Sequence, residues 1–405
     1  MSRNIIIIGT LDTRGEEIQY LKQRIEERGH KGHVIDVGVL GQVPFEPFIT
    51  RHEVAEAAET SIKEIIAQNH EGRAMSTMAR GMSKLLKAMI DRNEADGVIA
   101  AGGSMSTSLA LEAMTSLPIG FPKFILSTIA FSSFVNTSLV CPDLCMMLWP
   151  GGLYGLNSIS RRVLDSAAGA ISGMVETLGE QDTERKKVVG ITSLGISQLT
   201  YIKALKPALE ERGYEVAVFH TTGMGGRAFE QAINDGLIDV ALDLSLVELV
   251  DYVNGGATSS GEFRLKAASR KGIPQIIGAG GIGHFFWFSG KPLPPQFQGR
   301  KQHRHNQLMT IVVAETDDKR KVAELAAERL NLAEGPTAVI IPLKGWIEGD
   351  RHPKSPFHDS KGGEEFSRAF KAKIKPGIKV IELDAHVNDP AFCESVIKLF
   401  DEMVG

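Results

Sequence analysis

Three short segments rich in glycine, serine and threonine each lie between an apolar run and a helical pattern. A helix start leaves backbone N–H groups unpaired and carries the positive end of the helix dipole, so such segments favour a negatively charged ligand. The first segment, residues 9–15, offers Gly9, Thr10, Asp12, Thr13 and Arg14. The second, residues 101–107, offers Gly102, Gly103, Ser104, Ser106 and Thr107. The third, residues 220–227, offers Gly223, Gly225, Gly226 and Arg227.

Each segment has a functional and a purely structural interpretation. Arg14 could hold a phosphate through two N–H groups, whereas Asp12 or Thr13 could simply cap a helix. Residues 101–107 lack the Lys-Ser/Thr pair of a P-loop, so a plain glycine turn is the alternative there. Ligands of open parallel sheets bind beyond the carboxyl ends of the strands. We therefore expect the three segments to line one pocket for a nucleotide or another small anion.

A fourth glycine-rich segment, residues 278–283, matches the dinucleotide-binding fingerprint by its glycine spacing alone. That fingerprint also needs an acidic residue about 20 positions further on. No acidic residue occurs between Glu262 and Glu315. We therefore do not expect NAD to bind at this segment.

Several aspartates and histidines lie in loops, where binding and catalytic residues are concentrated. We select Asp243, His305 and Asp359 as candidate catalytic residues. Each of them could instead be a loop residue that only forms hydrogen bonds. Asp12 and Asp143 are candidate ligands for magnesium, which prefers carboxylate oxygens.

The elements that must position these residues alternate between short apolar runs and helical patterns, which is typical of parallel sheets covered by helices. The sequence predicts an α/β fold with two Rossmann-like domains, mostly parallel sheets and an interdomain cleft. We place the domains at residues 1–180 and 188–405, joined by a polar linker at 181–187. Predicted helices in the first domain include residues 16–28, 51–69 and 81–92.

Composition limits the function classes. The chain has 405 residues and a formal net charge of −4, which disfavours general binding to nucleic acids or membrane surfaces. No apolar stretch is long enough for a membrane span, and we expect a cytoplasmic protein. The three cysteines, Cys141, Cys145 and Cys393, lack the further ligands of a zinc site and are expected to be structural thiols.

Motifs along essentially the whole chain resemble the UPF0261 family, the Tm-1-like ATP-binding proteins. The resemblance rests on residues 9–10 with 12–13, 101–104, 117–118 with 122–123, 155–157, 222–228, 305–306, 342–345, 356–359 and 384–390. It implies two Rossmann-like subdomains, ATP with Mg²⁺ as the ligand, and a homodimer. It does not imply a known reaction.

Two segments depart from the family pattern, and each of them lacks an aspartate. They are residues 127–133, where Phe131, Ser132 and Ser133 stand in place of a Ser-Gly-Asp run, and residues 278–282. Two functions remain open at this point. One is a metabolic enzyme that uses a nucleotide and acts on a small anionic substrate in the interdomain cleft. The other is a dimeric, nucleotide-gated module that binds another protein and catalyses nothing.

Overall fold

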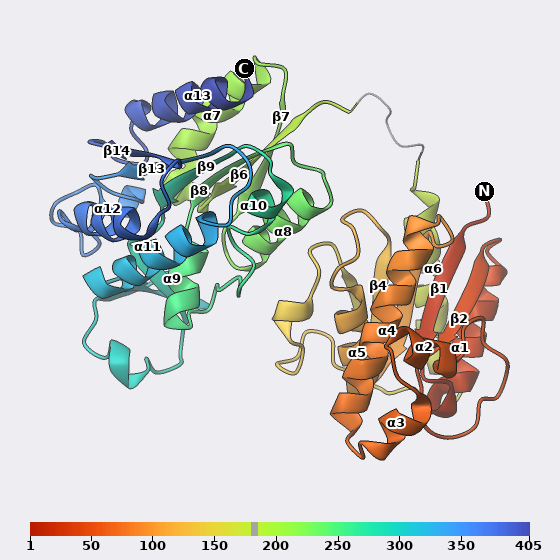
Figure 1. Cartoon of the computed structure of the whole chain (residues 1–405). Helices are drawn as coiled ribbons and strands as arrows, with labels where there is room; N and C mark the ends of the chain where they lie inside the picture. Colours follow the sequence, from red (N-terminus) through yellow and green to blue (C-terminus); the bar gives the residue numbers. More distant parts are fainter. Residues whose placement is uncertain (180–184) are drawn as a thin grey trace. The chain divides into compact units, whose positions relative to one another are not determined.

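The computed structural model describes residues 1–179 and 185–405. The chain divides into two compact units, Met1–Asp182 and Thr183–Gly405 (Figure 1). Part of the predicted linker, residues 181–184, lies outside the described residues. In the part of the chain that is described, no helix is both long and apolar enough to cross a membrane.

A five-stranded parallel sheet forms the centre of the first unit, in the order β2-β1-β3-β4-β5. Its strands are β1 (Asn4–Gly9), β2 (Lys31–Asp36), β3 (Gly97–Gly102), β4 (Lys123–Ser127) and β5 (Cys145–Leu148). Residues Ile5 to Ile8 of β1 are all buried. A strand that is apolar at consecutive positions is covered on both faces. This burial explains the run of isoleucines at residues 5–8.

Helices cover both faces of this sheet. Ile5 and Ile7 pack with α1 (Leu11–Glu26) and α6 (Ser158–Glu176). Ile6 and Ile8 pack in the core that α4 (Glu71–Asp91) and α5 (Ser104–Met114) cover. Because α1 leaves β1 toward one face and α5 leaves β3 toward the other, the sheet has a switch point between β1 and β3. Doubly wound sheets place their ligands at this point.

The predicted helix at residues 51–69 is two helices, α2 (Arg51–Ala57) and α3 (Ile62–Ala67). The break lies at Glu59, whose φ of 62° is not helical. Capping boxes at Thr50 and Ser61 start the two helices separately. The helix predicted at residues 81–92 begins earlier, at Glu71. The helix predicted at residues 16–28 also begins earlier, at Leu11.

The second unit has a six-stranded parallel sheet in the order β14-β13-β9-β8-β6-β7. The strands are β6 (Val188–Ser193), β7 (Glu215–His220), β8 (Val240–Ser245), β9 (Gln275–Gly280), β13 (Thr337–Pro342) and β14 (Lys379–Leu383). A separate antiparallel sheet, β10-β12-β11, consists of β10 (His284–Phe288), β11 (Gln302–Arg304) and β12 (Met309–Val313). The sequence pattern did not predict this small sheet.

Helices also cover both faces of the larger sheet (Figure 1). On one face lie α7 (Leu199–Glu210) and α13 (Pro390–Val404). On the other lie α9 (Val247–Asn254), α11 (Thr316–Leu330) and α12 (Gly362–Lys373). The remaining helices are α8 (Met224–Asn234) and α10 (Ala267–Lys271).

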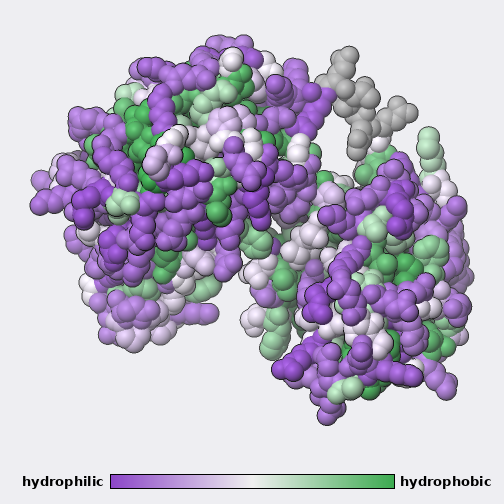
Figure 2. All heavy atoms as spheres, in the orientation of Figure 1, coloured by the Kyte–Doolittle hydropathy of each residue, from purple (hydrophilic) through white to green (hydrophobic). Residues whose placement is uncertain are grey.

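The prediction of an α/β protein with mostly parallel sheets is confirmed. The face of the molecule in Figure 2 is largely hydrophilic, as expected when the apolar side chains gather between sheet and helices. The cleft predicted between the domains stays a prediction.

Candidate functional site

A cavity of about 940 Å³ lies in the first unit, at the carboxyl ends of β1 and β3. The first two glycine-rich segments meet there, as predicted from their positions after the strands. From these segments Thr10, Asp12, Thr13, Arg14, Gly103, Ser104 and Ser106 line the cavity. The sheet opens at this point because α1 and α5 lie on opposite faces of it.

The start of α5 presents backbone N–H groups to the cavity. Among the described residues, no side chain caps this helix. Gly102 ends β3, and a Cβ there would overlap the side chain of Ser106, so glycine is needed for the close turn. Thr107 lies behind the cavity, where its Oγ1 is 2.8 Å from the Gly103 carbonyl and 2.7 Å from Ser127 Oγ. Thr107 therefore fixes the turn, whereas Ser104 and Ser106 face the ligand space.

The start of α1 forms the facing wall. Gly9 ends β1, and Thr10 is an N-cap whose hydroxyl makes no capping bond within the described structure. That hydroxyl instead lies 2.9 Å from Thr13 Oγ1. Arg14 departs from helical geometry, with φ −134°, and its guanidinium lies 4.6 Å from the centre of the Tyr154 ring. The wall thus presents two hydroxyl groups and one cation.

Asp12 has one oxygen in use and one without a partner. Its Oδ2 accepts the backbone N–H of Leu40 at 3.1 Å, whereas Oδ1 is buried and lacks a hydrogen-bond partner among the residues described. The neighbouring Asp36, in contrast, has a counterion within the chain, because Arg51 donates to its carboxylate at 2.7 Å inside the core. A buried carboxylate oxygen without a donor is destabilising. A cation or a ligand donor would therefore fit at Asp12.

The second predicted magnesium ligand, Asp143, lies elsewhere. It pairs with Nζ of the fully buried Lys123 at 2.8 Å and accepts the N–H of Gly120 at 2.7 Å. Both partners lie at the amino end of β4, whereas the cavity lies at the carboxyl ends of the strands. The structure therefore does not bring Asp143 to Asp12. Within residues 1–179 and 185–405, no group of three or more His, Cys, Asp or Glu side chains is placed to hold a metal ion.

The rest of the cavity comes from residues outside the glycine-rich segments. Its wall is apolar at Val39, Leu40, Ile65, Ile66, Ala74 and Met75, and polar at Asn69, His70, Glu71 and Thr128. His70 caps α4, since its Nδ1 accepts the N–H of Arg73 at 3.2 Å. This bond leaves the ring proton on Nε2. The break between α2 and α3 creates this wall, and the single helix predicted over residues 51–69 does not include it.

The third glycine-rich segment lies in the second unit, between β7 and α8. Oε1 of Glu248 accepts the backbone N–H groups of Gly223 and Gly226, at 2.5 and 3.0 Å. Gly225 packs against the carbonyl of His220. The Arg227 guanidinium lies over the Phe263 ring, 5.1 Å from its centre. The amides predicted to bind a ligand here already have a carboxylate, and a ligand role for them stays a prediction.

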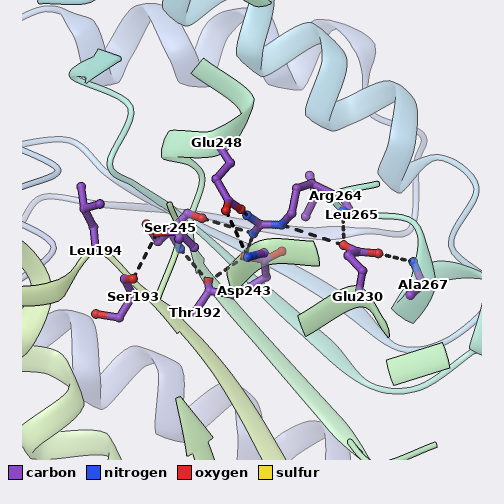
Figure 3. A network of polar contacts seen from close by, with 12 residues as sticks. Thr192, Ser193, Leu194, Glu230, Asp243, Ser245, Glu248, Arg264, Leu265 and Ala267 are labelled. Carbon is purple, nitrogen blue, oxygen red and sulfur yellow. Dashed lines mark hydrogen bonds and ion pairs between the residues drawn. The ribbon is translucent and has the colours of Figure 1, made fainter. Parts of the chain in front are cut away.

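Arg264 lies at the centre of a buried network of charges (Figure 3). It forms ion pairs with Asp243 and Glu248, and its Nε lies 4.0 Å from Glu230. Glu230 also accepts the N–H groups of residues 265–267 at the start of α10. Burial raises the pKa of Glu230 to about 7, against the opposing effect of Arg264. Asp243 accepts the Thr192 hydroxyl at 2.8 Å as well.

The three predicted catalytic residues occupy different surroundings. Asp243 is buried in the Arg264 network. Asp359 pairs with the buried Lys319 and accepts the N–H of Gly362 at 3.0 Å, at the start of α12. His305 is exposed after β11, and its backbone N–H bonds to the Met309 carbonyl. No hydrogen bond or ion pair joins the three within the described chain.

The fold and the cavity define a two-unit protein of doubly wound α/β sheets with a cavity at the carboxyl ends of the strands in its first unit. The chain belongs to the UPF0261 family. Residues 3–180 match the model described as "Uncharacterised protein family (UPF0261) N-terminal domain". Residues 186–404 match the corresponding C-terminal domain.

Relatives span the whole chain. A UPF0261 protein of Brucella suis biovar 1 is 41% identical over 405 residues, which cover 100% of this chain and 96% of the relative. A UPF0261 protein of Clostridium tetani is 33% identical, with 100% of both chains covered. The ToMV resistance protein Tm-1 of Solanum lycopersicum is 30% identical over 99% of this chain, which corresponds to 56% of the tomato protein. Among solved structures, the Streptomyces glycosyltransferase SsfS6 aligns over 68% of this chain and 81% of its own at 13% identity and a TM-score of 0.20, which is too weak to inform the function.

Proposed function

We propose that the first unit binds a nucleotide, with the phosphate groups at the starts of α1 and α5. The observation that supports this proposal is the cavity of about 940 Å³ into which two helix starts point. Pockets for small ligands typically measure about 300–1,000 Å³. Backbone N–H groups, hydroxyl groups and Arg14 supply donors for a phosphate. The apolar wall around Ile66 and Met75 suits the uncharged part of the ligand.

ATP with Mg²⁺ is the ligand that the family resemblance implies. The residues present fit a magnesium ion, because Asp12 Oδ1 is a buried oxygen for which the described residues supply no donor. Asp12 would hold the ion, which would neutralise phosphate charge when bound. The chain's own contribution is then to orient the phosphates with N–H and hydroxyl groups and to hold the cation with the carboxylate of Asp12.

A substitution at Gly103 tests the proposal with little effect on the fold. Its φ of −83° suits any residue, and in the described structure an added Cβ meets only Thr128 Oγ1, at 3.8 Å. The methyl group of Gly103→Ala would nevertheless lie where the phosphate must approach. We expect binding of ATP with Mg²⁺ to weaken more than tenfold, measured by isothermal titration calorimetry, with no change in the melting temperature of the unliganded protein.

Gly173→Ala is the matched control, because in the described structure a Cβ there meets nothing within 4 Å. Titration with ADP, AMP and inorganic phosphate identifies the part of the ligand that is bound, and phosphate release in the same samples separates an enzyme from a binding module. Equal binding by the wild type and Gly103→Ala, or no binding of any nucleotide by the wild type, would contradict the proposal.

A further inference from the structure

The third glycine-rich turn already holds a carboxylate, and this carboxylate belongs to the chain itself. Glu248 accepts two backbone N–H groups at the start of α8, those of Gly223 and Gly226. Its other oxygen forms an ion pair with Arg264 (Figure 3). Two N–H groups at a helix start together with a guanidinium form a donor set that proteins use for phosphate and carboxylate ligands.

The turn is shaped around this carboxylate. Gly223 has a φ of 90°, which residues with a side chain rarely adopt. A Cβ at position 226 would overlap the carboxylate of Glu248 and would also meet Arg264. The exposed fraction of Glu248 is 0%. Because Glu248 is fully buried and accepts two backbone N–H groups, we interpret the turn as an anion site that a carboxylate of the chain occupies.

The same residues lie where the fold would place a ligand. In the second sheet, α7 and α9 leave the neighbouring strands β6 and β8 toward opposite faces. The switch point therefore lies between β6 and β8. Arg264 lies beside this point, because it donates to Asp243 and to the Ser245 carbonyl near the end of β8. A guanidinium and a carboxylate from the chain thus lie on the β8 side of the switch point, and the carboxylate bonds to the turn that follows β7.

We infer that Glu248 is a built-in ligand that keeps a second anion site closed, and that this site takes a small carboxylate or phosphate once the side chain is removed. The donors of Gly223, Gly226 and Arg264 remain in place when Glu248 is truncated, and they would surround a space of carboxylate size. Burial raises the pKa of the Glu248 carboxyl, so its charge depends on these donors. The inference is independent of nucleotide binding in the first unit.

Chemical rescue of Glu248→Ala tests this inference. We expect the full-length variant to melt at a lower temperature than the wild type. Sodium formate should raise its melting temperature saturably, by about 5–10 °C at 100 times the dissociation constant. Sodium phosphate and sodium acetate are the other probes, and sodium chloride at matched ionic strength is the reference. The wild type should gain no more from formate than from chloride.

Two further variants make the test specific. Glu248→Gln keeps the space filled, so formate should not restore its stability. The double variant Glu248→Ala with Gly226→Ala places a methyl group in the vacated space, and rescue should disappear. If Glu248→Ala does not fold, the same comparison is made on the yield of refolding from urea with formate or chloride. The inference is overturned if no probe exceeds chloride in either measurement, or if the double variant is rescued equally.

Discussion

Replacing Asp251 with asparagine should make the stability of the second unit less dependent on pH. Asp251 lies on α9 and is fully buried, with an exposed fraction of 0%. Its Oδ1 accepts the N–H groups of Thr258 and Phe286, at 3.0 and 3.2 Å. Burial nevertheless dominates and raises the pKa of Asp251 from 3.8 to about 8. The carboxyl group is therefore protonated in the folded protein at neutral pH.

The sign of the effect follows from this shift. Below about pH 4 the group is protonated in both the folded and the unfolded chain, so its contribution to stability is fully present. As the pH rises from about 4 to 8, the unfolded chain releases the proton and the folded chain does not, so stability is lost. A shift of roughly four pKa units corresponds to an upper limit of about 6 kcal/mol, since each unit is about 1.4 kcal/mol. At pH 7 the upper limit is about 4 kcal/mol.

Equilibrium urea unfolding between pH 5 and 9 measures this effect, with tryptophan fluorescence as the signal. Trp346 is buried in the second unit and reports on its core. Asp251→Asn keeps an acceptor oxygen and cannot ionise, so the variant should exceed the wild type in free energy of unfolding by a few kcal/mol at pH 8–9. The exposed Asp384→Asn is the matched control and should follow the wild type. Parallel pH curves for Asp251→Asn and the wild type would show that Asp251 is ionised in the folded chain and would refute the reasoning.

Three further predictions concern charges held by the fold. Arg51→Leu should lower the free energy of unfolding of the first unit by about 3–5 kcal/mol in urea titrations, because it leaves the buried Asp36 without its counterion; an unchanged urea midpoint would contradict this. Asp12→Asn should abolish the gain in nucleotide affinity that Mg²⁺ provides, measured by calorimetry with and without the metal, and a retained gain would remove Asp12 from the metal site. In urea unfolding, Asp359→Asn should lower the free energy of unfolding of the second unit by about 1–3 kcal/mol, because the pair with Lys319 is lost. If a reaction is found, a variant that loses turnover at unchanged stability would instead indicate that Asp359 is catalytic.

The sequence predicted the parts of the site that depend on strand ends. Gly9 and Gly102 end neighbouring strands, and the carboxyl ends of parallel strands share one edge, so the first two segments had to meet. The wall formed by α3 and the start of α4 was not predicted, because the break at Glu59 is a backbone turn at a residue with no turn preference. The expectation that Asp143 lies near Asp12 was wrong. The sequence does not reveal that Asp143 pairs with Lys123, which is 20 residues away and fully buried.

The occupation of the third glycine-rich segment by the Glu248 carboxylate could not be inferred from the residues of that segment. Gly223 and Gly226 have the spacing of a ligand-binding turn, and what distinguishes them from Gly103 is Glu248, more than 20 residues later in the chain. Both sheets have the same order around their first strand, so the fold alone offers a ligand site in each unit. In the second unit, Glu248 and Arg264 satisfy each other and the turn. A buried ion pair is costly to open, since removing either partner leaves a buried charge. One nucleotide per chain is therefore the stoichiometry that these contacts predict, and a calorimetric stoichiometry of two would mean that Glu248 yields to the ligand.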